Sequence, residues 1–287
     1  MPEYPEPTIY AIPLFLVTLF GERWILRRWR REKRDVIGYE RKDTWASLAM
    51  GLGSLFFVFF INWGIFAITK WTWAHRVVDV GHGVLGWTVA ILGWDLSFYL
   101  YHRVEHENRF LWACHVNHHS SQHYNLSTAL RQPWTPYMGL VFFPVWGFVG
   151  VEPSMVMISG GINLVYQYWI HTEVIGKLPA PVEWIMNTPS HHRVHHGSNP
   201  EYLDKNYAGI FIIWDRMFGT FAPERARVRF GLTKNIETFN PFVIAFHEYW
   251  AIAKDVARAR SWRTRLGILW HGPAWQPPAT VVSADAE

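Results

Sequence analysis

The feature that most constrains this chain is residues 44–69, a run of 26 residues without one Asp, Glu, Lys or Arg. A helix of about 20 predominantly apolar residues crosses the hydrocarbon core of a bilayer, so this run is long enough to span a membrane. Inside lipid, every backbone N–H and C=O must be paired within the protein, which helices and closed barrels achieve. An uninterrupted apolar run of this length predicts a helical integral membrane protein.

Four more stretches have the length and apolarity of membrane spans. Residues 9–26 and 83–101 are interrupted by isolated charges, whereas residues 132–151 and 153–170 carry none and are separated by Glu152. The Glu152-Pro153 pair is typical of a tight turn, which favours a helical hairpin made of the last two stretches. The sequence therefore predicts an all-α integral membrane protein, a bundle of about five transmembrane helices.

The distribution of charge predicts how the bundle is oriented. Seven Lys and Arg residues crowd positions 23–34, whereas positions 1–7 carry only two Glu. Basic residues stay on the cytoplasmic side, so we expect the N-terminus outside and, after five spans, the C-terminus in the cytoplasm. A charge that follows the apolar run also argues against a cleaved signal peptide. The net charge of +4 lies mostly beside the spans, so we expect no nucleic-acid partner.

Histidines carry the strongest chemical signal. Ten of the 15 fall in three clusters: His102 and His106; His115, His118, His119 and His123; His191, His192, His195 and His196. Spacings of three and four place side chains on one helix face, where imidazoles can aim at one point. Eight of them exceed what one tetrahedral zinc uses but suit two neighbouring metals of higher coordination. The second His of a zinc-hydrolase motif is missing after His106-Glu107.

The predicted topology brings the three clusters to one side of the membrane. The first cluster lies at the end of the third span, the second follows within ten residues, and the third comes after the hairpin returns. His171 stands where the returning span leaves the membrane, so we expect it as a ninth ligand. The role of His191 is open between ligand and support, and that of His123 between support of the site and a position in a solvated loop.

These three clusters resemble the membrane fatty acid hydroxylase and sterol desaturase superfamily, whose motifs are HxxxH, HxxHH and HxxHH. Here the motifs read HRVEH from His102, HVNHH from His115 and HRVHH from His192, and the resemblance covers residues 95–221. The flanks NHHSSQHYNLSTALRQ and NTPSHHRVHHGSNPEYLDKNYAGIFIIWDRMFGTF look most like alkylglycerol monooxygenases and their bacterial relatives. His123 departs from that subfamily, in which a Tyr or Glu is expected.

The resemblance implies a membrane bundle with a cytoplasmic His-rich di-metal cap. It also implies a monooxygenase in which two iron ions activate O2 to hydroxylate a lipid chain that approaches from the bilayer, with an ether lipid of the alkylglycerol type as substrate. The implied reductant is a tetrahydropterin in the ether-lipid branch, and a cytochrome or ferredoxin in the other branches. A desaturase and a sterol or fatty acid hydroxylase stay open as alternatives.

Two carboxylates are candidate catalytic residues. Asp95 shares a helical stripe with His102 and His106, so it could accept the free N–H of a metal-bound imidazole. A carboxylate inside a membrane span is costly without a partner, and a bond to a neighbouring helix would also provide one. Glu107 directly follows a predicted ligand and could bind metal, move protons or lie in solvent.

A non-catalytic metal transporter or sensor is the competing class. Transporters hold their ions near the bilayer midplane on broken helices, whereas these clusters lie at helix ends. The sequence predicts that the whole chain, residues 1–287, forms one membrane-embedded domain. Its final part, residues 240–287, is expected to form an amphipathic helix, on the membrane surface or packed on the soluble part, followed by a loose tail from Gln276.

Overall fold

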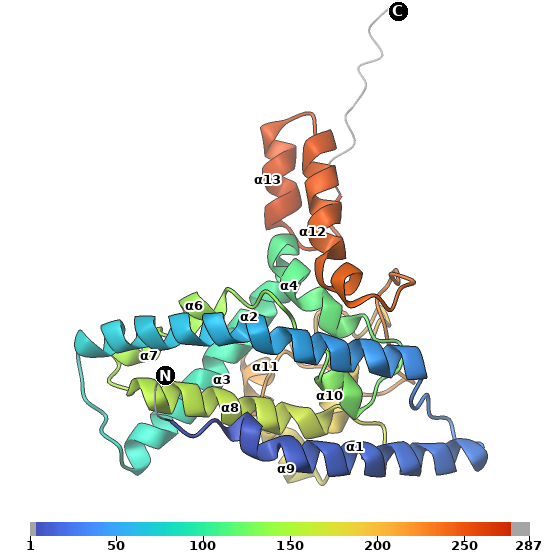
Figure 1. The fold of residues 1–287 in the computed structure, drawn as a ribbon, viewed down its shortest axis with the longest axis horizontal. Helices are drawn as coiled ribbons and strands as arrows, with labels where there is room; N and C mark the ends of the chain where they lie inside the picture. Colours follow the sequence, from blue (N-terminus) through green and yellow to red (C-terminus); the bar gives the residue numbers. More distant parts are fainter. Residues whose placement is uncertain (1–3, 277–287) are drawn as a thin grey trace, which may run out of the picture.

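The computed structural model describes residues 4–276, and its regular elements are helices, with one isolated bridge between Gly197 and Phe230 (Figure 1). The helices are α1 Pro7–Arg31, α2 Arg41–Ala74, α3 Val84–Glu107, α4 Arg109–His119, α5 Leu126–Ala129, α6 Gly139–Phe142, α7 Val145–Phe148, α8 Pro153–Ile170, α9 Ala180–Ile185, α10 Pro189–His195, α11 Ile213–Phe218, α12 Pro241–Arg258 and α13 Trp262–Trp270. The predicted all-α class is confirmed.

Three of these helices, α1, α2 and α3, are long and apolar enough to cross a membrane. They contain the predicted spans 9–26 and 44–69 and nearly all of 83–101. The Glu40 side chain accepts the Asp43 N–H at 2.7 Å and so caps the start of α2. Large apolar side chains such as Leu52, Phe56 and Trp63 are exposed on α2, as expected for a face that meets lipid.

Residues 132–151 do not form the continuous helix that we predicted. Proline removes a backbone donor and clashes with the preceding turn, and the segment contains Pro133, Pro136 and Pro144. It forms only the short helices α6 and α7 and runs beside α2. The Trp134 indole donates to the Met50 carbonyl at 2.9 Å, and Gly147 packs against Thr72. The segment packs against α2 through both short helices, which covers part of its irregular backbone.

The second arm of the predicted hairpin is helical. Glu152 occupies the N-cap position of α8 without a side-chain capping hydrogen bond, and Pro153 occupies the first turn. The helix packs against α1, α2 and α3, and its polar residue Asn163 is buried. α8 does not belong to the helices that qualify as candidate spans. It ends at His171, which therefore lies at the end of the bundle where α3 also ends (Figure 1).

Asn108 makes the turn that brings the first two histidine clusters together. It ends α3 in an extended conformation, and its side-chain oxygen accepts the Leu111 N–H at 3.0 Å. The same residue therefore caps the start of α4, which folds back and packs against α3. The motif residues of α4 face those of α3 for this reason.

Helices α12 and α13 form a hairpin that projects from the bundle and lies across the direction of α2 (Figure 1). Asn240 caps α12, as predicted. Ile244 and Ile252 are buried against the protein, whereas Phe242 and Trp250 are exposed. The helix is amphipathic and is tied to α4 by the Arg109–Glu248 ion pair at 2.7 Å. The tail after Gln276 lies outside the described residues.

Candidate metal centre

Nine histidines from four helix ends converge in the interior of the protein. They form two groups, in each of which the ligand atoms lie within 4.8 Å of one another. The five-histidine group consists of His102, His106, His115, His119 and His195; the four-histidine group consists of His118, His171, His192 and His196. The nine histidines predicted as ligands, His171 included, are the members of these two groups. Each group draws on segments that the sequence places far apart.

The five-histidine group is centred on His115. Its Nε2 atom lies 2.9 Å from Nε2 of His102 and 3.0 Å from Nε2 of His119. Two of the outer nitrogens contact backbone carbonyls. His102 Nδ1 contacts the Tyr207 carbonyl at 2.7 Å, and His195 Nδ1 contacts the Lys205 carbonyl at 3.1 Å. These contacts leave the Nε2 atoms directed at the interior of the group.

The four-histidine group is built in the same way around His171. Its Nε2 atom lies 3.1 Å from Nε2 of His118 and 2.9 Å from Nε2 of His192, and His192 Nε2 lies 3.2 Å from that of His196. His118 Nδ1 contacts the Arg131 carbonyl at 3.2 Å, and His171 Nδ1 contacts the Gln167 carbonyl at 2.7 Å. A carbonyl acceptor fixes the tautomer that leaves Nε2 free for a metal.

The geometry fits a metal ion in each group. Metal–imidazole bonds of about 2.0–2.1 Å place neighbouring ligand nitrogens about 3 Å apart, as observed here. The Nε2 atoms of His106 and His195 are buried without a hydrogen-bond partner among the described residues. A buried polar atom without a partner is costly, and coordination would satisfy both. These two groups therefore fit a di-metal site.

Burial keeps these imidazoles in the form that binds metals. Desolvation lowers the pKa of His118 to about 4 and holds the pKa values of His192 and His196 well below the ordinary value. The neighbouring imidazoles act in the same direction on His192 and His196, because like charges repel. The rings are therefore neutral near pH 7, as metal ligation requires.

The remaining histidines of the clusters lie outside both groups. His191 Nε2 contacts Glu183 Oε2 at 2.9 Å, which is a supporting position behind the third motif. His123 is joined to neither group; its carbonyl accepts the Asn125 amide at 2.7 Å. Asn206 also supports the third motif, since its side-chain amide donates to the His191 carbonyl at 3.0 Å.

Asp95 does not make the predicted contact with a ligand imidazole. Its oxygens accept four hydrogen bonds: from Asn163 at 2.6 Å, from the Ile210 and Phe211 amides at 2.7 and 3.0 Å, and from the Trp214 indole at 2.8 Å. Four donors occupy this buried carboxylate. Asp95 therefore holds the loop whose Tyr207 carbonyl contacts His102. It contacts no histidine of the five-histidine group and supports this group only through that loop.

Glu107 lies at the surface, and a second acidic side chain, Glu105, is buried beside the five-histidine group. The Glu107 side chain is 48% exposed and accepts from Arg103 at 2.8 Å. Glu105 is 1% exposed, and its Oε2 lies 3.6 Å from His115 Nδ1. Sequence reasoning missed Glu105, although it was detectable: it shares an otherwise aromatic stripe of α3 with Trp94, Phe98 and Tyr101.

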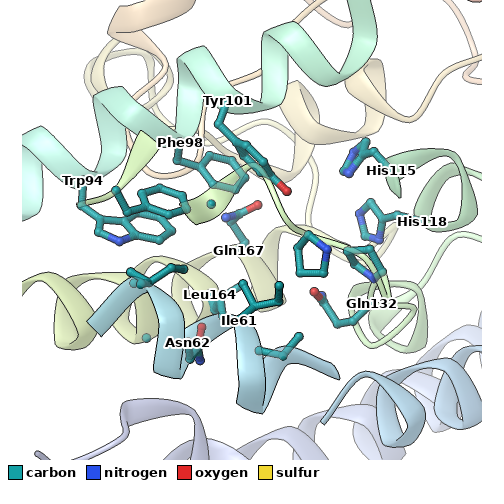
Figure 2. A pocket seen from close by; sticks show the side chains of 18 of the residues that line it. Ile61, Asn62, Trp94, Phe98, Tyr101, His115, His118, Gln132, Leu164 and Gln167 are labelled. Atoms are coloured by element: carbon teal, nitrogen blue, oxygen red, sulfur yellow. The ribbon is translucent and has the colours of Figure 1, made fainter. Parts of the chain in front are cut away.

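A cavity leads from the two groups into the bundle. His115, His118 and His171 line it at one end together with Glu105, and Trp94 lies at the other. Figure 2 shows Phe98 and Tyr101 between these ends, and Leu164 and Ile61 on the opposite wall. Three amide side chains also line the cavity: Asn62, Gln132 and Gln167. A mostly apolar channel that ends at metal-binding groups suits a lipid chain.

Residues 87–220 match the fatty acid hydroxylase family. The alkylglycerol monooxygenase of Danio rerio is 48% identical over 192 residues, and that of Xenopus tropicalis is 46% identical over 192 residues; each match covers 67% of this chain and 43% of the relative. The ornithine lipid hydroxylase OlsE of Rhizobium tropici is 28% identical over 179 residues, which are 58% of this chain and 48% of that protein. No solved structure matches.

The matched region contains the whole candidate site. All nine histidines of the two groups lie within residues 87–220, as do Asp95, Glu105 and Glu107. The chain spans less than half the length of the alkylglycerol monooxygenases it matches.

Proposed function

Because this chain belongs to the fatty acid hydroxylase family, we propose that it is a membrane di-iron monooxygenase that hydroxylates a lipid chain with O2. The observation that carries the proposal is the pair of buried histidine groups at the end of an apolar cavity. Two irons would supply the activation of O2. One O2, two electrons and two protons then give one hydroxyl group on the chain and one water.

The residues of this chain position the reaction. The nine histidines would hold the irons. The Nδ1 atoms of four of them contact backbone carbonyls, and those of two others lie near carboxylates. The cavity walls hold the substrate chain beside His115 and His118 and keep water away from the reacting carbon. Asp95, through the loop that it holds, keeps His102 in place, and Glu107 is our candidate for moving protons near the surface.

The substrate that we propose is an alkylglycerol, because the alkylglycerol monooxygenases named above are 46–48% identical to this chain. Hydroxylation of the carbon beside the ether oxygen gives a hemiacetal, which then cleaves without further enzyme chemistry. As reductant we propose a tetrahydropterin, with a cytochrome or ferredoxin as the alternative donor. A sterol or fatty acid hydroxylase or a desaturase would use the same irons on another lipid.

An assay of the purified protein tests this function. Membrane-reconstituted protein, O2, an alkylglycerol and a tetrahydropterin should give the fatty aldehyde and glycerol, and His195→Ala should not. Product formation that is equal in the His195→Ala variant would show that the histidine groups are not the site. A metal transporter would bind the metal but form no product from any lipid.

We also propose an orientation: the N-terminus lies outside and both histidine groups lie on the cytoplasmic side. The chain would cross five times, by α1, α2, α3, the broken segment of residues 132–151, and α8. The basic residues after α1 support this placement. Reporter fusions after Gly38 and at Glu287 should both read cytoplasmic. An external signal at either position contradicts the scheme.

A further inference from the structure

Packed side chains close the end of the cavity that lies away from the histidine groups, and we call this end the floor. On α3 the lining runs over eleven positions, from Trp94 to Glu105 at the metal end, and on α8 it runs over fourteen positions, from Met157 to His171. At the helical rise, these walls are about 16 Å and about 21 Å long. The two long walls of the cavity therefore end about one helical turn apart, where Trp94 faces Gly160.

Close packing closes the cavity at this depth. The Trp94 ring stacks on Phe143 with centroids 4.3 Å apart and planes 2° from parallel. A Cβ at Gly160 would lie 3.0 Å from the Trp94 indole, so the missing side chain lets the ring reach the α8 backbone. At the next residue, Gly161, a Cβ would lie 2.5 Å from Pro7 of α1. Adjacent glycines thus seal α8 against α3 and α1.

The two ends of the cavity differ in chemistry. Gln132, Gln167 and Glu105 lie at the metal end, where they can meet the polar part of a substrate. The floor consists of Trp94 and Phe143, with Met157 beside them. The carboxylate of Glu6, which also lines this region, accepts the Thr8 hydroxyl at 2.9 Å. An alkyl chain is best accommodated with its polar end at the histidines and its methyl end on the stacked rings.

We propose that Trp94 and Phe143 determine the longest alkyl chain that this protein accepts. The proposal rests on the proposed function for the kind of substrate, an alkyl chain with one polar end. It does not rest on turnover, because the floor limits binding whether or not the bound chain is oxidised. Replacing either ring by a smaller apolar side chain opens the floor and admits longer chains.

The test measures binding along a series of 1-O-alkylglycerols that differ only in chain length. The holoprotein in phosphatidylcholine nanodiscs is titrated with each compound at equal mole fraction in the membrane, and the rise in Tm reports binding. Wild-type protein should bind progressively better up to one length and then lose affinity. Trp94→Leu should bind the first excluded length at least about tenfold more tightly, the smallest effect expected for a methylene in an apolar pocket.

Two further variants keep the result interpretable. Trp146→Leu is the matched control, because Trp146 packs on Gly93 of the same helix and donates to Ser97 at 2.8 Å but does not line the cavity. Phe143→Leu opens the floor from the other ring, should Trp94→Leu not fold. A cut-off that moves in Trp94→Leu or Phe143→Leu and stays in Trp146→Leu supports the proposal.

The proposal is overturned if wild-type protein shows no cut-off, or if the floor variants keep the wild-type profile. A cut-off that moves equally in Trp146→Leu also overturns it. Failure of the proposed function looks different: the binding profile shifts as expected, but no alkylglycerol is oxidised by any variant.

Discussion

The five-histidine and four-histidine groups have similar geometry but different surroundings. Behind the five-histidine group stand two carboxylates: Glu105 lies 3.6 Å from His115 Nδ1, and Asp204 lies 3.8 Å from His106 Nδ1. Carbonyls stand behind both groups, those of Tyr207 and Lys205 behind the first and those of Arg131 and Gln167 behind the four-histidine group, for which no carboxylate contact is found among the described residues. Carboxylates add negative charge and make an imidazole a stronger ligand, whereas carbonyls fix its orientation without a full charge. The two metals are therefore expected to be inequivalent.

The largest expected effect comes from removing one ligand of either group. His195→Ala disrupts the five-histidine group, and His118→Ala disrupts the four-histidine group; each should lower the bound iron and reduce turnover more than about 100-fold, beyond the effect of a supporting residue. Metal analysis and product assay on the same sample measure both. His123→Ala is the control, because His123 flanks the second motif but belongs to neither group. Wild-type iron content in both the His195→Ala and the His118→Ala variant would contradict the proposal that the two groups bind iron.

The next prediction separates two carboxylates that lie two residues apart. Glu105→Gln should weaken metal retention by the five-histidine group about 10–100-fold, because it removes the carboxyl group behind His115. Glu107→Gln should leave metal retention unchanged, since Glu107 contacts Arg103 and no imidazole. If Glu107 moves protons, as we propose, its variant loses most turnover with its metal content intact.

A chelator titration followed by a turnover assay distinguishes these outcomes. Wild-type metal retention in Glu105→Gln would show that Glu105 has no bearing on the metal, and equal metal loss in both variants would show that its buried position does not distinguish it from Glu107. Wild-type turnover in Glu107→Gln would remove Glu107 from the reaction and leave both histidine groups as they are.

The smallest expected effect is that of Asp95→Asn. The substitution replaces one carboxylate oxygen by an NH2 group, which cannot accept the two hydrogen bonds that this oxygen accepts. The loop that carries the Tyr207 carbonyl therefore loosens, and His102 loses part of its orientation. We expect about a tenfold loss of metal affinity in the five-histidine group, the lower limit for a supporting residue. The four-histidine group should retain its metal. Asp215→Asn offers a comparison, because Asp215 accepts the Tyr207 and Ala208 amides at 2.8 and 2.9 Å in the same loop. An unchanged affinity in both variants would mean that this loop does not position His102.

Apart from His171, the histidines of the two groups could be selected from the sequence because they are clustered at helical spacings of three and four. The division into five and four could not. His118 and His119 are neighbours in sequence, yet they belong to different groups, since adjacent residues of a helix point about 100° apart. The four-histidine group depends on His171, whose Nε2 atom comes near that of His118 only in the folded bundle.

The errors in the sequence analysis also have physical causes. Residues 132–151 are apolar enough for a span, but their prolines break the helix, and packing against α2 compensates for the lost hydrogen bonds. Asp95 shares a stripe with His102, yet its donors come from residues 163 and 210–214, which only the tertiary fold brings near. Hydropathy and periodicity describe one helix at a time. They do not predict which hydrogen-bond partners another segment of the chain supplies.

The central claim, that two histidine groups hold two redox metals, is tested most directly by metal analysis of protein purified without chelators. The account predicts about two irons per chain, one for each group, and turnover that follows the iron content. Full turnover with zinc in place of iron would contradict it, because zinc has no redox chemistry.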